Sequence, residues 1–192
     1  MMEIVTVHYN TPDLLERLIR SSNAICEYPI RVIDGSDTES MQQATKAICD
    51  LFLNVTLEQH GWNIHHGRGL HHAVSTSAFS LVLCVDSEVQ LLDGIFRIFK
   101  YKTPLEGFCC DVNNHGMNVP QGQGILYLHP ELLMVNADWY KSQPHHFIHH
   151  GAPAIDLMRH TSNAEKTCIP EELKKFYIRG GRGTVNRFGY NF

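Results

Sequence analysis

Residues 81–88 are LVLCVDSE, an apolar run that ends in an acid, a serine and a second acid. A short, fully apolar run that contains β-branched residues is typical of a strand covered on both faces of a sheet. Asp86 and Glu88 follow directly, where such a strand would end. Carboxylate oxygens are the ligands that hard divalent cations prefer. The stretch therefore predicts a buried strand with a metal-binding end, the alternative being a solvated turn.

Upstream of this stretch, strand and helix patterns alternate. Residues 4–9 (IVTVHY), 30–33 (IRVI) and 54–58 predict three more strands. Thr11-Pro12-Asp13 supplies an N-cap residue, a first-turn proline and an early acid for a helix, and a second helical pattern covers about residues 39–51. Strands that alternate with helices predict parallel pairing with right-handed crossovers. We therefore expect an α/β fold.

Three polar residues, Asn10, Asp34 and Asp86, each come just after an expected strand. Ligands of parallel sheets gather at the carboxyl ends of the strands, so these side chains should converge on one rim. Residues 61–69 are expected to form a glycine-rich polar loop that opens a helix of small residues.

Beyond residue 100 the patterns are weaker. We expect strands over residues 107–112 and 124–128, with His129-Pro130 ending the second, and a short helix over residues 154–160. The glycine-rich, basic residues 179–184 are expected to form a flexible tail.

Composition excludes some classes of protein. The chain has 192 residues, of which 43% are hydrophobic, which is enough for one sizeable core. A formal charge of −4 gives no basic field, so general nucleic-acid binding is not expected. No apolar stretch approaches the roughly 20 residues of a membrane span, and the N-terminus lacks a signal-peptide pattern. We expect a cytoplasmic protein without a transmembrane segment.

Cysteine and histidine usage does not indicate a zinc motif. The six cysteines form no Cys-x-x-Cys pair, so we expect reduced thiols. The chain has 13 histidines, many of them in doublets such as His65-His66 and His71-His72. No His-Glu-x-x-His or Cys/His spacing appears, so a zinc protein is not expected.

The order of these motifs resembles the family-two, GT-A-type inverting glycosyltransferases. Residues 4–21 (IVTVHYNTPDLLERLIRS) resemble the family's opening strand, turn and first helix, and residues 32–37 (VIDGSD) resemble the acidic strand end that holds the nucleotide base. Residues 63–92 (NIHHGRGLHHAVSTSAFSLVLCVDSEVQLL) resemble the stretch that leads into its Asp-x-Asp metal motif. The resemblance is closest over residues 4–92 and looser over residues 105–187. Ile33 and Glu88 stand where the family usually has aspartates.

The resemblance implies a GT-A fold, with a Rossmann-like, mostly parallel central sheet flanked by helices and a less regular C-terminal acceptor-side region. We expect a single domain over residues 1–192, in which residues 1–100 form the nucleotide-sugar-binding half. Residues 101–192 would then form the acceptor-binding half and the C-terminal tail.

The activity implied is metal-dependent, inverting transfer of a hexosyl or related sugar from a nucleotide-diphosphate sugar to an acceptor hydroxyl, with a UDP-sugar as the expected donor. Mn²⁺ or Mg²⁺ on Asp86 and Glu88 would neutralise the leaving diphosphate, one carboxylate binding directly and the other through water. His149 or His150 would contact the metal or the acceptor, and we place His150 in the metal set. The donor contacts expected are Val7, Tyr9, Asn10, Asp34, Asn63, Gly67, Arg68, Arg179 and Arg182.

Direct displacement at the sugar also needs a general base for the acceptor hydroxyl. In the family this base is an acid on a helix of the C-terminal half, and Asp156 is the best local match, with Asp111 and Asp138 as the next candidates. The acceptor could be a glycan, a lipid-linked intermediate, a protein or a modified nucleic-acid base. The sequence leaves the donor sugar and the oligomeric state open.

Two other functions fit parts of the pattern. A nucleotidyltransferase of sugar phosphates would also use a metal carboxylate, but it would normally carry a glycine-rich basic loop after the first strand, where this chain has Asn10-Thr11-Pro12. A non-catalytic nucleotide-sugar-binding protein would share the donor site without turnover.

Overall fold

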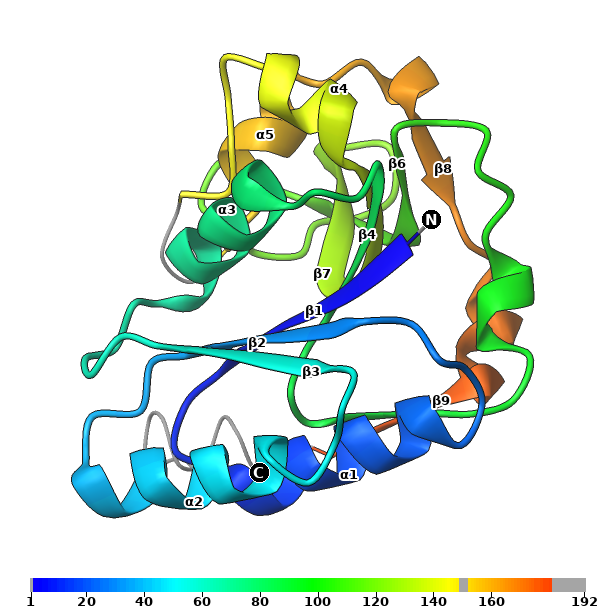
Figure 1. Cartoon of the computed structure of the whole chain (residues 1–192). Coiled ribbons are helices and arrows are strands. Elements are labelled where there is room, and N and C mark those ends of the chain that lie inside the picture. The colour runs from blue at the N-terminus through cyan, green and yellow to red at the C-terminus, as the bar shows by residue number, and fades with distance from the viewer. Residues whose placement is uncertain (1, 149–151, 181–192) are drawn as a thin grey trace.

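A central sheet organises the protein, whose computed structural model describes residues 2–148 and 152–180. Its seven strands lie in the order β3-β2-β1-β4-β7-β6-β8 (Figure 1). The strands are β1 (Met2–His8), β2 (Ile30–Asp34), β3 (Val55–Gln59), β4 (Leu81–Val85), β6 (Leu105–Val112), β7 (Ile125–Asn136) and β8 (Lys166–Cys168). All the pairings are parallel except those of β7, which runs antiparallel to both β4 and β6. The predicted mostly parallel α/β sheet is confirmed.

Helices cover both faces of this sheet. The α-helices are α1 (Pro12–Asn23), α2 (Glu39–Cys49), α3 (His66–Thr76), α4 (Ala137–Ser142) and α5 (Ile155–His160). Short 3₁₀ helices are η1 (Ile95–Ile98), η2 (Asn163–Glu165) and η3 (Glu171–Phe176). Figure 1 shows α1 and α2 below β1–β3, with α3, α4 and α5 on the other side. None of the helices within the described ranges is long and apolar enough to cross a membrane.

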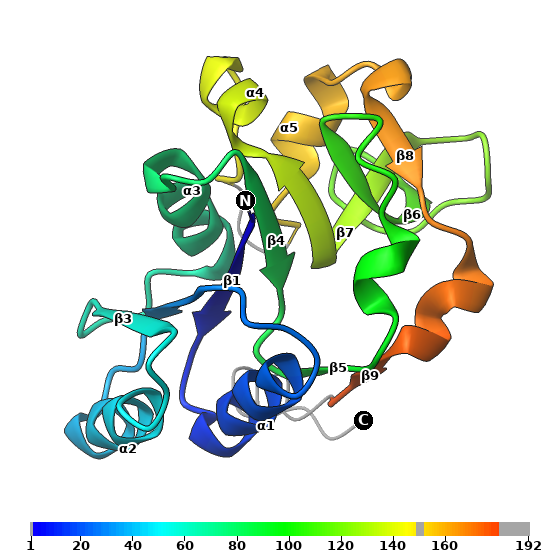
Figure 2. The ribbon, with the colours of Figure 1, turned by 45° about the vertical axis from the view of Figure 1, so that its right-hand side comes forward.

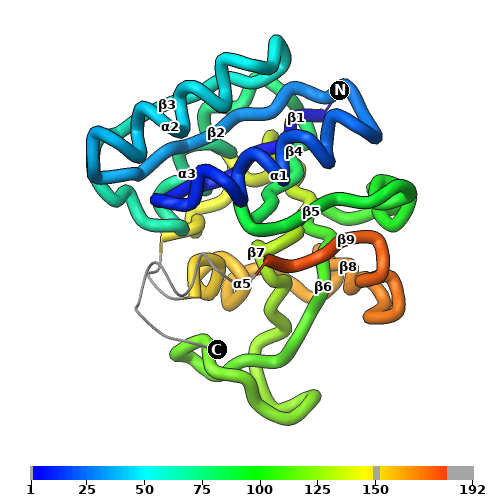
Figure 3. The backbone as a smooth tube through the Cα atoms, turned by 90° about the horizontal axis from the view of Figure 1, so that it is seen from below, coloured from blue at the N-terminus to red at the C-terminus, as the bar shows by residue number. Residues whose placement is uncertain are grey.

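A second, two-stranded sheet lies outside the central one. It pairs β5 (Val89–Leu91) with β9 (Tyr177–Arg179) in antiparallel fashion. Figures 2 and 3 show this pair beside α1, and the Leu91 N–H donates a hydrogen bond of 3.1 Å to the Ser21 hydroxyl of that helix. Residue 179, expected at the start of a flexible tail, therefore ends a strand; residues 181–184 lie outside the described residues.

β1 belongs to the core on both of its faces. Successive side chains of a strand point to opposite faces, so Ile4 packs with Leu15 and Leu18 of α1, whereas Val5 and Val7 pack with Leu70 of α3. All seven residues of β1 are buried. The opening run IVTVHY is therefore the central strand of the parallel half.

Helix α1 begins at the proline that the sequence singled out. The Leu14 and Leu15 N–H groups donate to the Thr11 carbonyl at 3.0 and 3.1 Å, which closes the first turn. The expected side-chain cap is absent, since Thr11 makes no cap hydrogen bond. Instead, the Thr11 N–H donates to His8 Nε2 at 3.1 Å, so the helix start is fixed to the end of β1.

The prediction that His129-Pro130 ends a strand is wrong, because β7 continues to Asn136. The register between β6 and β7 shifts between Gly107 and Cys109, and Pro130 lies in the extra residues of β7 at this bulge. The missing N–H of Pro130 therefore falls in an irregular stretch of the ladder, where proline is tolerated.

The expectation of reduced cysteines is wrong for one pair, because Cys109 and Cys168 form a disulfide. The parallel pairing of β6 with β8 brings the two residues together, a contact that 59 residues of separation conceal in the sequence. Disulfides persist mainly in oxidising compartments, and the cytoplasmic location stays a prediction.

The expected polar loop over residues 61–69 is also shorter than predicted, because α3 begins at His66. Gly67, Arg68 and Gly69 form the first turn of this helix. Gly69 lies directly against β1, where an added Cβ would come within 2.8 Å of both Cγ atoms of Val7. The close packing of helix on strand explains this glycine.

Gly69→Ala should destabilise the protein by about 1 to 3 kcal/mol, because overpacking against Val7 outweighs the gain of about 1 kcal/mol in helix propensity. Urea unfolding would measure the change. The double variant Gly69→Ala/Val7→Ala should cost less than the sum of the two single variants, because it removes the clash. A Gly69→Ala protein as stable as the wild type would contradict this packing.

Candidate functional site

A cavity of about 230 Å³ opens at the carboxyl end of β4. Its lining combines segments that are far apart in the sequence. The lining includes His66, Asp86, Glu88, Tyr127, His129 and Arg179.

Asp86 and Glu88 occupy a turn that is fixed on both sides. The Asp86 N–H donates to the Glu131 carbonyl of β7, and the Asp86 carbonyl accepts from the Val89 N–H of β5, each at 3.0 Å. Glu88 is buried, with 6% of its surface exposed. A buried strand thus delivers both predicted carboxylates to the cavity, as the sequence suggested.

His66, which the sequence analysis did not single out, joins this pair. Its Nε2 lies 3.1 Å from Asp86 Oδ1, and its side chain is 17% exposed. The first turn of α3 carries His66 to this position. The His65-His66 doublet was the available signal, but only the contact between α3 and the end of β4 shows which of the two histidines faces the acid.

Arg179 on β9 lies between two carboxylates of the cavity wall. Its Nε is 3.5 Å from Glu88 Oε1, and its Nη1 is 3.2 Å from Glu131 Oε2. Burial disfavours the charged guanidinium, but Glu131, Asp86 and Glu88 outweigh it and raise the pKa of Arg179. Arg179 therefore stays charged. Its partner Glu131 is, after His66, a second residue of this region that the sequence analysis missed.

The residues present fit a divalent cation. Asp86 and Glu88 supply the carboxylate oxygens that suit Mn²⁺ or Mg²⁺, and His66 adds an imidazole nitrogen, which is a ligand of transition metals rather than of Mg²⁺. The side chains of Asp86, Glu88 and Glu131 are only 18%, 8% and 10% exposed. Arg179 contributes one positive charge beside these three carboxylates. The cavity therefore carries an excess of poorly solvated negative charge, which a cation would offset.

A second polar cluster follows the ends of β1 and β2. The Tyr9 hydroxyl donates to Asp37 Oδ2 at 2.7 Å, and Asn10 Nδ2 donates to Asp37 Oδ1 at 3.0 Å. These hydrogen bonds lower the pKa of Asp37. Asn10 adopts a left-handed φ of 53°. Tyr9 and Asn10 thus meet around an exposed acid that the sequence analysis did not select, and their contact with a donor stays a prediction.

Asp34 is fully buried in this region. Its carboxylate accepts from His8 Nδ1 at 2.9 Å, from Gln59 Nε2 at 3.0 Å and from the Ser36 N–H at 3.0 Å. Burial alone would raise the pKa of Asp34, but these hydrogen bonds outweigh it and hold the pKa below its ordinary value. Its contacts are internal, and a contact with a nucleotide stays a prediction.

The other expected donor contacts are scattered. Val7 is in the core, Asn63 Oδ1 accepts from the His65 N–H at 3.0 Å, Gly67 is buried and Arg68 is exposed at the start of α3. The expected contacts His149, His150 and Arg182 lie outside the described residues.

Asp156 on α5 is not among the residues found to line the cavity within the described ranges, although Ala152 and Pro153 are. Its Oδ2 accepts from His145 Nδ1 at 3.0 Å, and its Oδ1 is 3.6 Å from His160 Nδ1. Of the alternatives, Asp111 accepts from the Gly122 N–H and Asp138 is exposed on α4. His129 lines the cavity as His66 does, and its Nδ1 lies 3.8 Å from Glu131 Oε2.

Comparison with known proteins identifies the fold. No family model and no curated protein matches the sequence. A mannosyltransferase from Pyrobaculum calidifontis, solved with GDP-Man and Mn²⁺, has a TM-score of 0.64 at 12% identity, covering 88% of this chain and 55% of its own. TarS 1-349 from S. aureus, solved with UDP-GlcNAc, has a TM-score of 0.59 at 17% identity, covering 82% and 52%.

GalNAc-T7, solved with UDP, GalNAc and Mn²⁺, has a TM-score of 0.58 at 10% identity, covering 73% of this chain and 35% of its own. The fold is of the GT-A type. At these identities the likeness shows the fold alone. The chain spans 55% and 52% of the first two of these structures, about half their length.

Asp34→Asn should lower the free energy of unfolding at pH 7 by about 2 kcal/mol, because hydrogen bonds to a buried charged group are lost. The pKa of Asp34 is lower in the folded than in the unfolded protein, so its contribution is present above the ordinary aspartate pKa of about 3.9 and is lost as the pH falls through the folded value. Urea unfolding between pH 2 and 7 would measure both effects.

The matched control is Asp37→Asn, which changes an exposed acid of the same segment and should alter stability less. An Asp34→Asn protein with wild-type stability and the same loss of stability in acid would show that the buried carboxylate contributes nothing to folding.

Proposed function

We propose that this protein is a metal-dependent glycosyltransferase that moves a sugar from a nucleotide-diphosphate sugar to an acceptor hydroxyl. The observation that carries the proposal is the Asp86-Ser87-Glu88 turn at the carboxyl end of β4, which lines a cavity together with His66 and Arg179. The GT-A fold supports it, because ligands of such sheets bind beyond the carboxyl ends of the strands.

Asp86 and Glu88, with His66 beside Asp86, would hold Mn²⁺ or Mg²⁺. When bound, the cation supplies Lewis-acid stabilisation of the negative charge that grows on the leaving diphosphate. Arg179 adds a fixed positive charge to the same cavity, and Arg68 lies exposed at the start of α3. Both arginines can bind phosphate oxygens through their planar donor groups.

We propose a UDP-sugar as the donor, with the base and ribose near Tyr9, Asn10 and Asp37. These side chains form one hydrogen-bonded cluster at the ends of β1 and β2. TarS was solved with UDP-GlcNAc and GalNAc-T7 with UDP, which favours uridine. The mannosyltransferase was solved with GDP-Man, so guanosine is the alternative that binding measurements should include.

Inverting transfer is the proposed stereochemistry. In one displacement, the acceptor oxygen bonds to the anomeric carbon, the bond from that carbon to the diphosphate oxygen breaks, and a base takes the hydroxyl proton. We propose Asp156 as this base, with His145 orienting its carboxylate. His129 is the alternative because it lines the cavity; burial lowers its pKa, which favours the neutral imidazole that a base requires.

UDP binding should depend on the metal and on the two carboxylates. Isothermal titration of UDP with Mn²⁺ should give a Kd at least about 10-fold tighter than titration of UDP alone, since a shared cation links the carboxylates to the diphosphate. Asp86→Asn/Glu88→Gln should remove this difference.

The control Glu39→Gln/Asp50→Asn makes the same change of charge at exposed positions of α2 and its C-cap, and it should bind like the wild type. If the wild type binds neither UDP nor GDP with Mn²⁺, the glycosyltransferase proposal fails. Metal-dependent binding without donor hydrolysis or transfer to any acceptor would favour a non-catalytic nucleotide-sugar-binding protein.

Asp156→Asn should lower kcat by about 10²-fold or more while leaving the Kd of UDP unchanged, because general-base catalysis typically contributes this much and the base does not hold the donor. Donor hydrolysis, with water as the acceptor, would measure it before the acceptor is known. If His129→Gln shows the loss and Asp156→Asn does not, the base is His129.

A further inference from the structure

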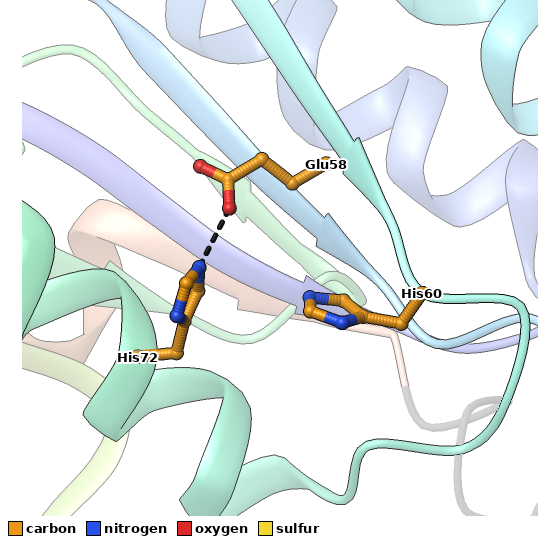
Figure 4. Close-up of side chains that lie close together, drawn as sticks. All are labelled: Glu58, His60 and His72. Atoms are coloured by element: carbon orange, nitrogen blue, oxygen red, sulfur yellow. Dashed lines mark hydrogen bonds and ion pairs between the residues drawn. The ribbon is translucent and has the colours of Figure 1, made fainter.

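Three side chains of types that bind metals meet near β3 and α3, outside the cavity that contains Asp86 and Glu88. Glu58 is in β3, His60 follows that strand directly, and His72 is in the second turn of α3. One ligand atom from each lies within 4.8 Å of the other two. Figure 4 shows the three side chains pointing toward one shared space.

His72 and Glu58 are already in contact, whereas His60 has a nitrogen without a hydrogen bond. His72 Nε2 lies 2.7 Å from Glu58 Oε2. The His60 ring is almost perpendicular to the His72 ring, at 89°, with centroids 5.7 Å apart. His60 Nε2 is buried and has no hydrogen-bond partner among the described residues. A buried polar atom left unpaired is costly, and a bound cation would satisfy it.

The neighbouring charges leave one oxygen of Glu58 available to a cation. Arg31 Nη1 lies 3.4 Å from Glu58 Oε1 and Nη2 lies 3.4 Å from Glu3 Oε2. Glu3 therefore balances Arg31, while Glu58 keeps its second oxygen directed at His72. Hydrogen bonds of this kind to a ligating carboxylate orient it and support metal binding.

We propose that Glu58, His60 and His72 form a second metal site, which takes a divalent transition metal of the Zn²⁺ class. Two imidazoles and one carboxylate are a zinc ligand set that leaves a fourth position for water. Zn–N bonds of about 2.1 Å place tetrahedral ligand atoms about 3.4 Å apart, so the present limit of 4.8 Å closes by small side-chain rotations. Each of the three residues is partly exposed and can make this adjustment.

The proposed site explains why no zinc motif is visible in the sequence. His60 follows β3 and His72 lies in α3, so they have no His-x-x-x-His type of spacing, and the return of the chain from β3 into α3 brings them together. The proposal departs from our expectation that the histidines indicate no zinc.

Another cluster, His145, Asp156 and His160, fits a metal less well. The two histidine rings stack in parallel, 3.6 Å apart, and Nδ1 of each ring already bonds to Asp156, from His145 to its carboxylate and from His160 to its backbone carbonyl. The buried nitrogen without a hydrogen bond distinguishes the site at Glu58.

A metal at this site would clamp β3 to α3. The connection between them, residues 60–65, contains Asn63 and leads to His66 in the cavity. Metal binding would therefore stabilise the segment that positions His66. The site does not depend on the proposed transferase activity, since its ligands are different residues.

The test is isothermal titration of Zn²⁺ into the metal-free protein, with Co²⁺ absorption as a report on the ligand geometry. The wild type should bind Zn²⁺ at this site, and Glu58→Gln and His60→Gln should each weaken that binding by about 100-fold, since loss of a group that only orients a ligand already costs about 10- to 100-fold. Glu58→Gln keeps the size of the side chain, and circular dichroism would confirm that both variants fold.

Two controls separate this site from others. His71→Gln changes the adjacent histidine, whose Nδ1 bonds to the Tyr140 hydroxyl at 3.0 Å, and should retain Zn²⁺ binding. Asp86→Asn/Glu88→Gln should retain it as well, even if UDP binding fails. If Glu58→Gln and His60→Gln both bind Zn²⁺ as the wild type does, or if only the Asp86/Glu88 variant loses it, the proposal is wrong.

Discussion

Burial of β1 between two parallel neighbours is the constraint on which the rest of the structure depends. β1 pairs with β2 on one side and β4 on the other, and all of its residues are buried. Because the three strands run in one direction, their carboxyl ends meet at one edge of the sheet. Asn10, Asp37 and Asp86 reach that edge from three separate parts of the chain. The burial of β1 between its parallel neighbours therefore determines where the polar clusters form.

The reversed strand β7 completes the cavity. It returns past β4 from the opposite direction, so His129 and Glu131 face the turn that carries Asp86. β9 then places Arg179 against Glu88 and Glu131. A strand parallel to β4 in the place of β7 would end at the same edge of the sheet as β4. It would not run past the turn that carries Asp86.

The N-terminal half could be predicted because its signals are local. Pro12 begins a helix by its own geometry, and LVLCV is apolar enough to require burial. The C-terminal half depends on pairing between distant residues. Pro130 looks like a strand end until the bulge at Cys109 is known, and β8 and β9 have only three residues each, too few for a periodic pattern. His66 gains its position only through the packing of α3.

The disulfide between Cys109 and Cys168 makes one part of the cavity wall more resistant to mechanical force than another. It closes a covalent loop with a sequence separation of 59, which contains β7, α4 and α5. In the chain-entropy model such a loop stabilises by about 4 kcal/mol. Arg179 lies beyond this loop, on a strand of three residues held by β5. Tension on residue 180 would therefore separate β9 from β5 first. The cavity would then lose Arg179 while the disulfide still held the segment that contains β7.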